Sequence, residues 1–91
     1  MLDDAISDFL GIDSNKFPKE NPKLIVSRYG SSMNERIQVI MTAFEHELHN
    51  NPNLEIAEAI EVAKAKISEK FPEIGQSGLD ALERAFSYWF K

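Results

Sequence analysis

The segment EHELH at 45–49 brings two histidines and two glutamates together, so it is the first place to look for a metal site. A zinc protease helix carries two histidines four residues apart, so that both ring nitrogens reach one ion from the same face. His46 and His49 are only three apart. A di-iron bundle site would need a glutamate three residues before each histidine, where Ala43 and His46 stand. We therefore predict no metal here and expect two histidines in solvent.

The segment DSN at 13–15 places oxygen atoms at the first and third positions of a calcium-binding loop. The sixth position of that loop requires glycine and the twelfth a bidentate glutamate, but Pro18 and Leu24 stand there. Calcium is therefore excluded. The chain has no cysteine and no phosphate-binding glycine motif, and nothing brings a serine to the two histidines. We predict that the protein is not an enzyme and has no catalytic residue and no cofactor.

The basic stretch SRYGSSMNER at 27–36 has the outline of a helix-turn-helix, with Gly30 between two predicted helices. In that interpretation its polar side chains would reach phosphates or another anion at a helix N-terminus. The candidate contacts to a partner or an anion are Arg28, Tyr29, Ser31, Ser32 and Arg36. A purely structural interpretation competes with this one, because Ser32 and Glu35 fit the capping box that begins a helix.

All these residues are expected to lie on or between helices. Apolar residues recur about every 3.6 residues in each segment with a regular pattern, and no segment shows the apolar–polar alternation of a strand. Leu24-Ile25-Val26 would also suit a strand, but the chain offers no second strand to pair with it. A chain of 91 residues cannot enclose two cores, so we predict one helical domain, 1–91. The predicted fold is an all-α bundle of three longer helices at about 33–49, 53–71 and 78–90, with short helices near 2–10 and 23–29.

Residues that commonly begin or end helices mark most of these boundaries. Gly11 stands where a cap would close the first helix. The capping box at Ser32 would begin the helix 33–49, whose apolar stripe would be Ile37, Ile40, Met41, Phe44 and Leu48. Asn51 or Asn53 would begin the next helix, with Pro52 at its first position if Asn51 is the cap. Ser77 would cap the last helix.

The C-terminal segment AFSYWFK at 85–91 holds four of the nine aromatic residues. At about 100° per residue, one apolar stripe forms along the last helix, and we expect its aromatic members Phe86 and Trp89 in the core. The full stripe is Leu79, Leu82, Phe86, Trp89 and Phe90. Tyr88 falls on the opposite side with Ala81 and Ala85, where it is a candidate contact for a second subunit or another partner.

The composition limits which partners and which cellular location we expect. The chain carries 15 acids against 10 bases, a net charge of −5, and residues 37–61 hold five acids and no base. Such a surface repels nucleic acid, so a nucleic-acid partner is disfavoured. No apolar run approaches the ~20 residues of a membrane span, and the N-terminus lacks the basic start of a secretory signal. We expect a cytoplasmic protein that does not enter a membrane, which agrees with the absence of cysteine.

These observations favour a small acidic, non-enzymatic protein-protein interaction or regulatory module, which would self-associate as a homodimer or bind a partner protein. The alternative is a helix-turn-helix nucleic-acid-binding protein that uses the basic 23–36 segment. A third hypothesis is that the carboxylates of 3–8 and 45–61 mimic nucleic acid, although an ordinary solvated acidic face explains them too. Residue types alone do not identify the partner.

Overall fold

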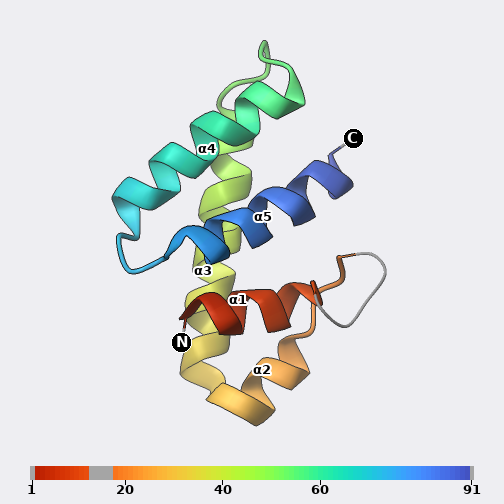
Figure 1. Cartoon of the computed structure of the whole chain (residues 1–91), viewed down its shortest axis with the longest axis vertical. Coiled ribbons are helices and arrows are strands. Elements are labelled where there is room, and N and C mark those ends of the chain that lie inside the picture. Colours follow the sequence, from red (N-terminus) through yellow and green to blue (C-terminus); the bar gives the residue numbers. More distant parts are fainter. Residues whose placement is uncertain (1, 13–17, 91) are drawn as a thin grey trace.

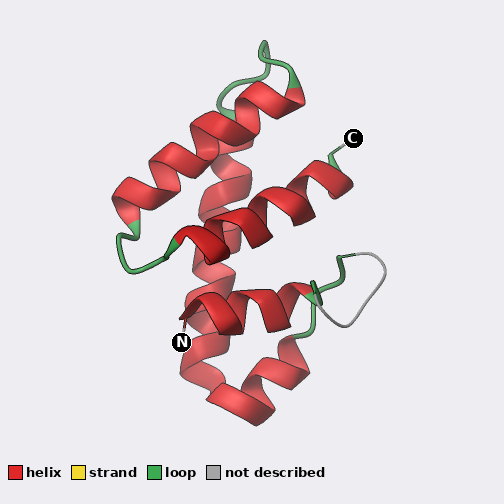
Figure 2. Cartoon of the chain, in the orientation of Figure 1, coloured by secondary structure: helices red, strands yellow, loops and turns green. Residues whose placement is uncertain are grey.

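Residues 2–12 and 18–90 are described by a computed structural model of the chain. They form five helices and no strand (Figures 1 and 2). The helices are α1 (Leu2–Leu10), α2 (Pro22–Tyr29), α3 (Ser31–His49), α4 (Ile56–Lys70) and α5 (Gln76–Trp89). The predicted all-α bundle of three longer and two short helices is confirmed.

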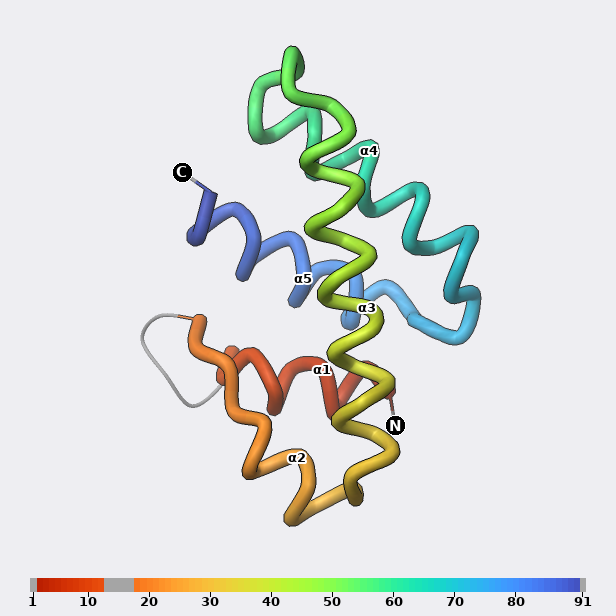
Figure 3. Tube along the Cα trace, turned by 180° about the vertical axis from the view of Figure 1, so that it is seen from behind, coloured from red at the N-terminus to blue at the C-terminus, as the bar shows by residue number. Residues whose placement is uncertain are grey.

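Helix α3 is the longest at 19 residues and runs along the long axis of the molecule (Figures 1 and 3). Helix α2 packs beside its first half, and α4 packs on its second half. Helices α1, α5 and α4 follow one another across α3 as a second layer, with α5 between the other two. The order of the layer differs from the order of the chain, so α1 contacts the C-terminal helix α5 directly.

The core lies between these two layers and takes the apolar stripe of each helix. On α3 the buried residues are the predicted stripe, Ile37, Ile40, Met41, Phe44 and Leu48. Phe44 stacks on Phe86 of α5, with ring centroids 4.5 Å apart. Aromatic pairs in this offset geometry add about 0.5–1.5 kcal/mol beyond the area that they bury. The Phe44–Phe86 pair therefore joins the two layers near the middle of the molecule.

Helices α1 and α2 each end at a glycine, as the positions of Gly11 and Gly30 in the sequence predict. After α1, Gly11 donates to the carbonyl of Asp8 and Ile12 donates to that of Ser7, which is the Schellman pattern. Gly30 alone connects α2 to α3, and its φ of 95° lies in a region that residues with a side chain avoid. The predicted capping box is wrong, because α3 begins at Ser31 and no side chain caps it. Ser32 is already inside the helix.

The start of α4 also differs from the prediction. The helix begins at Ile56, with Glu55 extended before it, and not at Asn51 or Asn53. The side chain of Asn51 instead donates to the carbonyl of Glu47, 3.0 Å away, at the end of α3. Asn51 thus completes the preceding helix, since the last carbonyls of a helix lack partners within it.

The N-terminus of α5 is capped by a residue from the other end of the chain. The predicted cap, Ser77, is wrong: α5 begins at Gln76, and its own cap residue is Gly75, which has no side chain to bond with. The carboxylate of Asp3 on α1 accepts hydrogen bonds from the Gly75 amide at 2.9 Å and from the Ser77 hydroxyl at 2.8 Å. A Cβ on Gly75 or Gly78 would stand 2.5 or 2.7 Å from that carboxylate, so a side chain at either position would displace Asp3 from its cap.

The exposed face of α5 is not the predicted one. Ala81 and Ala85 are buried, because α5 has α1 on one side and α4 on the other. Phe86 lies in the core as predicted, but Trp89 is 36% exposed and not buried. The position of Phe90 at the helix end predicts partial exposure, and its side chain is also 36% exposed. The stripe identified the inner face correctly, but α5 extends past the core at its C-terminal end (Figure 1).

Candidate functional site

Two of the candidate contacts from the basic stretch face the end of α1. Arg28 lies 3.3 Å from the carboxylate of Asp8, and the hydroxyl of Tyr29 donates to the same carboxylate at 2.9 Å. The hydrogen bond to Asp8, together with partial burial, raises the pKa of Tyr29 above its ordinary value of 10.0. Asp8 therefore holds α2 against α1 through two side chains.

The other arginine also has an acidic partner. Arg36 on α3 lies 2.7 Å from the carboxylate of Glu73, in the connection between α4 and α5. This contact holds the pKa of Glu73 below its ordinary value of 4.5. Ser31 and Ser32 are exposed in the first turn of α3. The structure does not gather the predicted contacts into one surface: the two arginines bind carboxylates in different places, and Tyr88 lies on α5.

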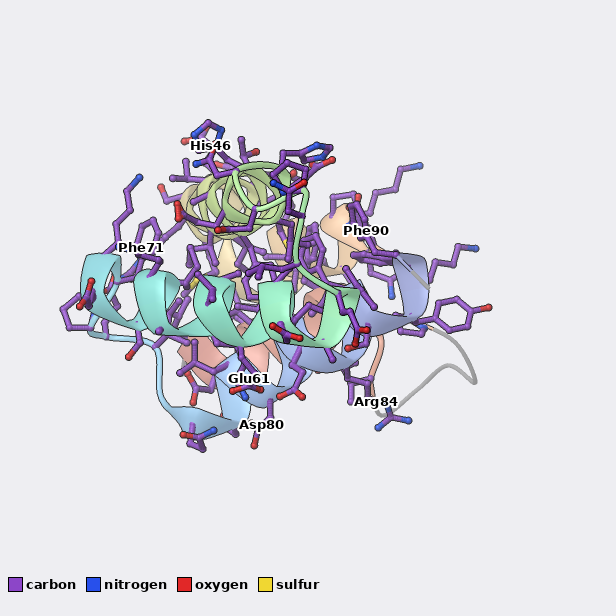
Figure 4. The ribbon with its side chains drawn as sticks, turned by 90° about the horizontal axis from the view of Figure 1, so that it is seen from above. His46, Glu61, Phe71, Asp80, Arg84 and Phe90 are labelled. Atoms are coloured by element: carbon purple, nitrogen blue, oxygen red, sulfur yellow. The ribbon has the colours of Figure 1, made fainter. Side chains whose placement is uncertain are left out.

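Both histidines are exposed, as predicted. His49 approaches Glu45 at 3.7 Å, and Figure 4 shows His46 projecting outward from the opposite side of the molecule to Glu61 and Asp80. Within residues 2–12 and 18–90, no three metal-binding side chains gather closely enough to hold an ion. No helix of that part of the chain is long and apolar enough to cross a membrane.

The densest group of charges joins α4 to α5. The ammonium of Lys64 lies 2.5 Å from Glu83, 3.5 Å from Asp80 and 3.9 Å from Glu61. Figure 4 shows Glu61 and Asp80 on the side where these two helices face each other. The hydrogen bond to Glu83, opposed in part by desolvation, raises the pKa of Lys64 above 10.5. Because Lys64 lies on α4 and two of its three carboxylate partners, Asp80 and Glu83, lie on α5, this group of charges links the two helices.

Exposed apolar side chains gather at the end of the molecule where α5 terminates. Four residues, each 36–37% exposed, form what we call the C-terminal apolar surface: Leu54, Ile56, Trp89 and Phe90. Leu54 lies in the connection before α4, and Ile56 is the first residue of α4. Trp89 and Phe90 come from the end of α5. In Figure 4, Phe90 lies near the end of α5, on the side of the view where α4 begins.

Two shallow hollows meet at Phe90. One, of about 240 Å³, lies between the end of α3, the following connection and α4, and its apolar walls include Leu54, Ile56 and Phe90. The other, also about 240 Å³, is bounded by Trp89 and Phe90 and by the carboxylates Glu20 and Glu45. Phe90 borders both hollows, of which the first is mainly apolar and the second is lined by polar side chains that include the two carboxylates.

Core contacts hold the aromatic end of this surface in place. Phe86, which is buried, contacts Trp89 edge-on at 5.4 Å and stacks on Phe90 at 5.8 Å. The indole of Trp89 also donates a long hydrogen bond, 3.4 Å, to the carbonyl of Pro18. The ring of His49 meets Phe90 edge-on at 6.2 Å. These contacts fix the orientation of the exposed Trp89 and Phe90 rings.

Sequence reasoning found Tyr88 but missed this surface. Tyr88 is 43% exposed, as predicted, but the alanines expected beside it are buried. The available signal was the number of aromatic residues at the end of the chain, since one helical stripe buries only about three residues in two turns. Spacing places Ile56 on the apolar stripe of the helix 53–71 and gives no signal for Leu54. Only the fold brings both residues next to the end of α5, where Ile56 is 36% exposed.

Comparison of the chain with protein-family models, with curated proteins and with solved structures found no match in any of the three.

Proposed function

We propose that this protein is a small, non-enzymatic module that binds another protein. The observation that carries the proposal is the C-terminal apolar surface, where side chains from two distant parts of the chain converge around Phe90. Contiguous exposed apolar area is unfavourable in water, and on a stable domain it commonly marks a contact surface. None of the four residues belongs to the cluster of buried side chains that forms the core of the described chain.

The composition of the surface supports the same function. Aromatic residues are enriched at the centres of protein interfaces, and tryptophan is prominent among the residues that contribute most binding energy. Trp89 and Phe90 are held by Phe86, so little conformational entropy would be lost when they are covered. Acidic groups at the border of the surface would steer an oppositely charged partner.

The helix-turn-helix alternative has less support. Both arginines that it relies on are paired with carboxylates, Arg28 with Asp8 and Arg36 with Glu73. A helix-turn-helix joins its helices by about three to four residues, whereas Gly30 alone connects α2 and α3. DNA binding would require both ion pairs to be exchanged for phosphate contacts.

The proposal can be tested by quantitative affinity capture from cells that naturally make the protein. Three baits would be compared: the wild-type chain, a double variant Leu54→Ser/Ile56→Ser, and Val39→Ser. Val39 is 57% exposed on α3, so its variant is a matched control that removes apolar surface elsewhere. We expect a protein that is enriched on the wild type and on Val39→Ser and is lost from the double variant.

Two outcomes contradict the proposal. The first is that no protein is enriched over an unrelated acidic bait while the chain stays monomeric in light scattering. The second is an enzymatic turnover traced to the purified chain. Circular dichroism of all three baits checks that each one is folded.

A further inference from the structure

The charges around the C-terminal apolar surface indicate what kind of partner it fits. Glu20 and Glu45 line the second hollow, and Glu55 stands between Leu54 and Ile56 in the chain. Apart from His49, the charged residues of the described chain that line the two hollows are carboxylates. Lys19, beside Glu20 in the chain, is the nearest base along that segment. An apolar surface with an acidic border favours a partner that is both apolar and basic.

A second copy of this chain is a poor match for the surface. The copy would bring its own net charge of −5, and a symmetric contact through Phe90 would place each Glu20 and Glu45 near those of the other copy. Like charges facing each other across an interface oppose association. The same charges favour a partner with lysines or arginines beside its apolar residues.

The shape of the surface indicates an amphipathic helix. The first hollow, walled by Leu54, Ile56 and Phe90, fits an apolar side chain, and the second, which contains Glu20 and Glu45, fits a basic one. A helix presents two such side chains on one face at i and i+3 or i+4. We infer that the C-terminal apolar surface binds a basic amphipathic helix of another protein, with an apolar anchor in the first hollow and basic residues toward Glu20 and Glu45 in the second. This inference rests on the proposed function and adds the partner's chemistry.

A synthetic peptide tests the inference without knowledge of the natural partner. The probe is a peptide of about 18 residues made of leucine and lysine, with leucines at helical spacing. One comparison peptide replaces every lysine by glutamate, and another replaces every leucine by alanine. The protein is labelled with ¹⁵N, and its amide shifts are followed during titration. We expect saturable shifts at residues 53–56 and 86–90 with the leucine–lysine peptide only.

Variants locate the contact and measure it. Phe90→Ser should raise the dissociation constant of the leucine–lysine peptide about tenfold, as truncation of a central aromatic contact does. Glu20→Gln/Glu45→Gln should weaken binding at low salt and have less effect at high salt, because screening weakens exposed charge pairs. Val39→Ser should leave the dissociation constant unchanged.

Several results would overturn the inference. They are a titration without saturable shifts, equal binding of the leucine–glutamate peptide, shifts centred on another face, or an unchanged affinity of Phe90→Ser. Shifts at 86–90 that grow with protein concentration in the absence of peptide would identify a second copy as the occupant. If the inference fails while affinity capture still yields a partner sensitive to Leu54→Ser/Ile56→Ser, the proposed function stands and only the partner's chemistry is wrong.

Discussion

At the scale of single residues, two carboxylates on α1 connect distant parts of the chain. Asp3 accepts hydrogen bonds at the N-terminus of α5, and Asp8 accepts them from Arg28 and Tyr29. A carboxylate at a helix N-terminus satisfies amides that have no partner within the helix and complements the helix dipole. Although partial burial raises the pKa of Asp3, bonds from Gly75, Ser77 and Gly78 lower it below 3.8 overall.

Asp3→Asn should lower the free energy of unfolding by about 1 kcal/mol, because an amide has one acceptor oxygen for the two donors, Gly75 and Ser77, and lacks the negative charge that the helix dipole favours. Because the folded-state pKa of Asp3 lies below its ordinary value, its contribution is complete above that value and is lost as the pH falls through the lowered pKa. Urea unfolding at neutral and acidic pH measures both effects. Asp4→Asn is the matched control, since Asp4 is exposed in the same turn. Equal midpoints for the two variants would show that Asp3 caps nothing.

At the scale of the elements, Lys64 joins α4 to α5, because its side chain is only 15% exposed and faces three carboxylates. Lys64→Met would keep most of the apolar stem but leave Glu61, Asp80 and Glu83 to repel one another. We expect a loss of about 1–2 kcal/mol, which is typical for hydrogen bonds that involve charged groups. The raised pKa of Lys64 means that its contribution is fully present below 10.5 and is lost as the pH rises through the raised pKa.

Urea unfolding midpoints at neutral pH check this prediction against Lys66→Met. Lys66 is an exposed neighbour on α4, so its replacement should change the midpoint little. Amide exchange should also become faster in α4 and α5 of Lys64→Met, while α2 keeps its protection. A Lys64→Met protein as stable as Lys66→Met would show that Lys64 does not stabilise the contact between α4 and α5.

At the scale of the whole molecule, one core joins the two layers, and its centre is the Phe44–Phe86 pair. Phe44 is fully buried, so Phe44→Ala should cost about 3–5 kcal/mol, a large share of the stability of a small domain. Thermal unfolding followed by circular dichroism and by the fluorescence of Trp89, the one tryptophan, should show coincident transitions that both shift. Val39→Ala, at an exposed site on the same helix, should shift neither. Separate transitions would indicate two independently unfolding units.

The sequence by itself determined the five helices and most of the core, because helical periodicity and a glycine at a helix end act within a few residues. The stripes of α3 and the burial of Phe86 followed from spacing alone. Only the tertiary structure decided the rest, since it depends on which distant segments become neighbours. Asp3 caps α5, Ala81 and Ala85 are covered by adjacent helices, and Leu54 meets Phe90 because the chain order and the packing order differ. The spacing of apolar residues defines the apolar face of a helix, but the neighbouring helices decide how much of that face is buried.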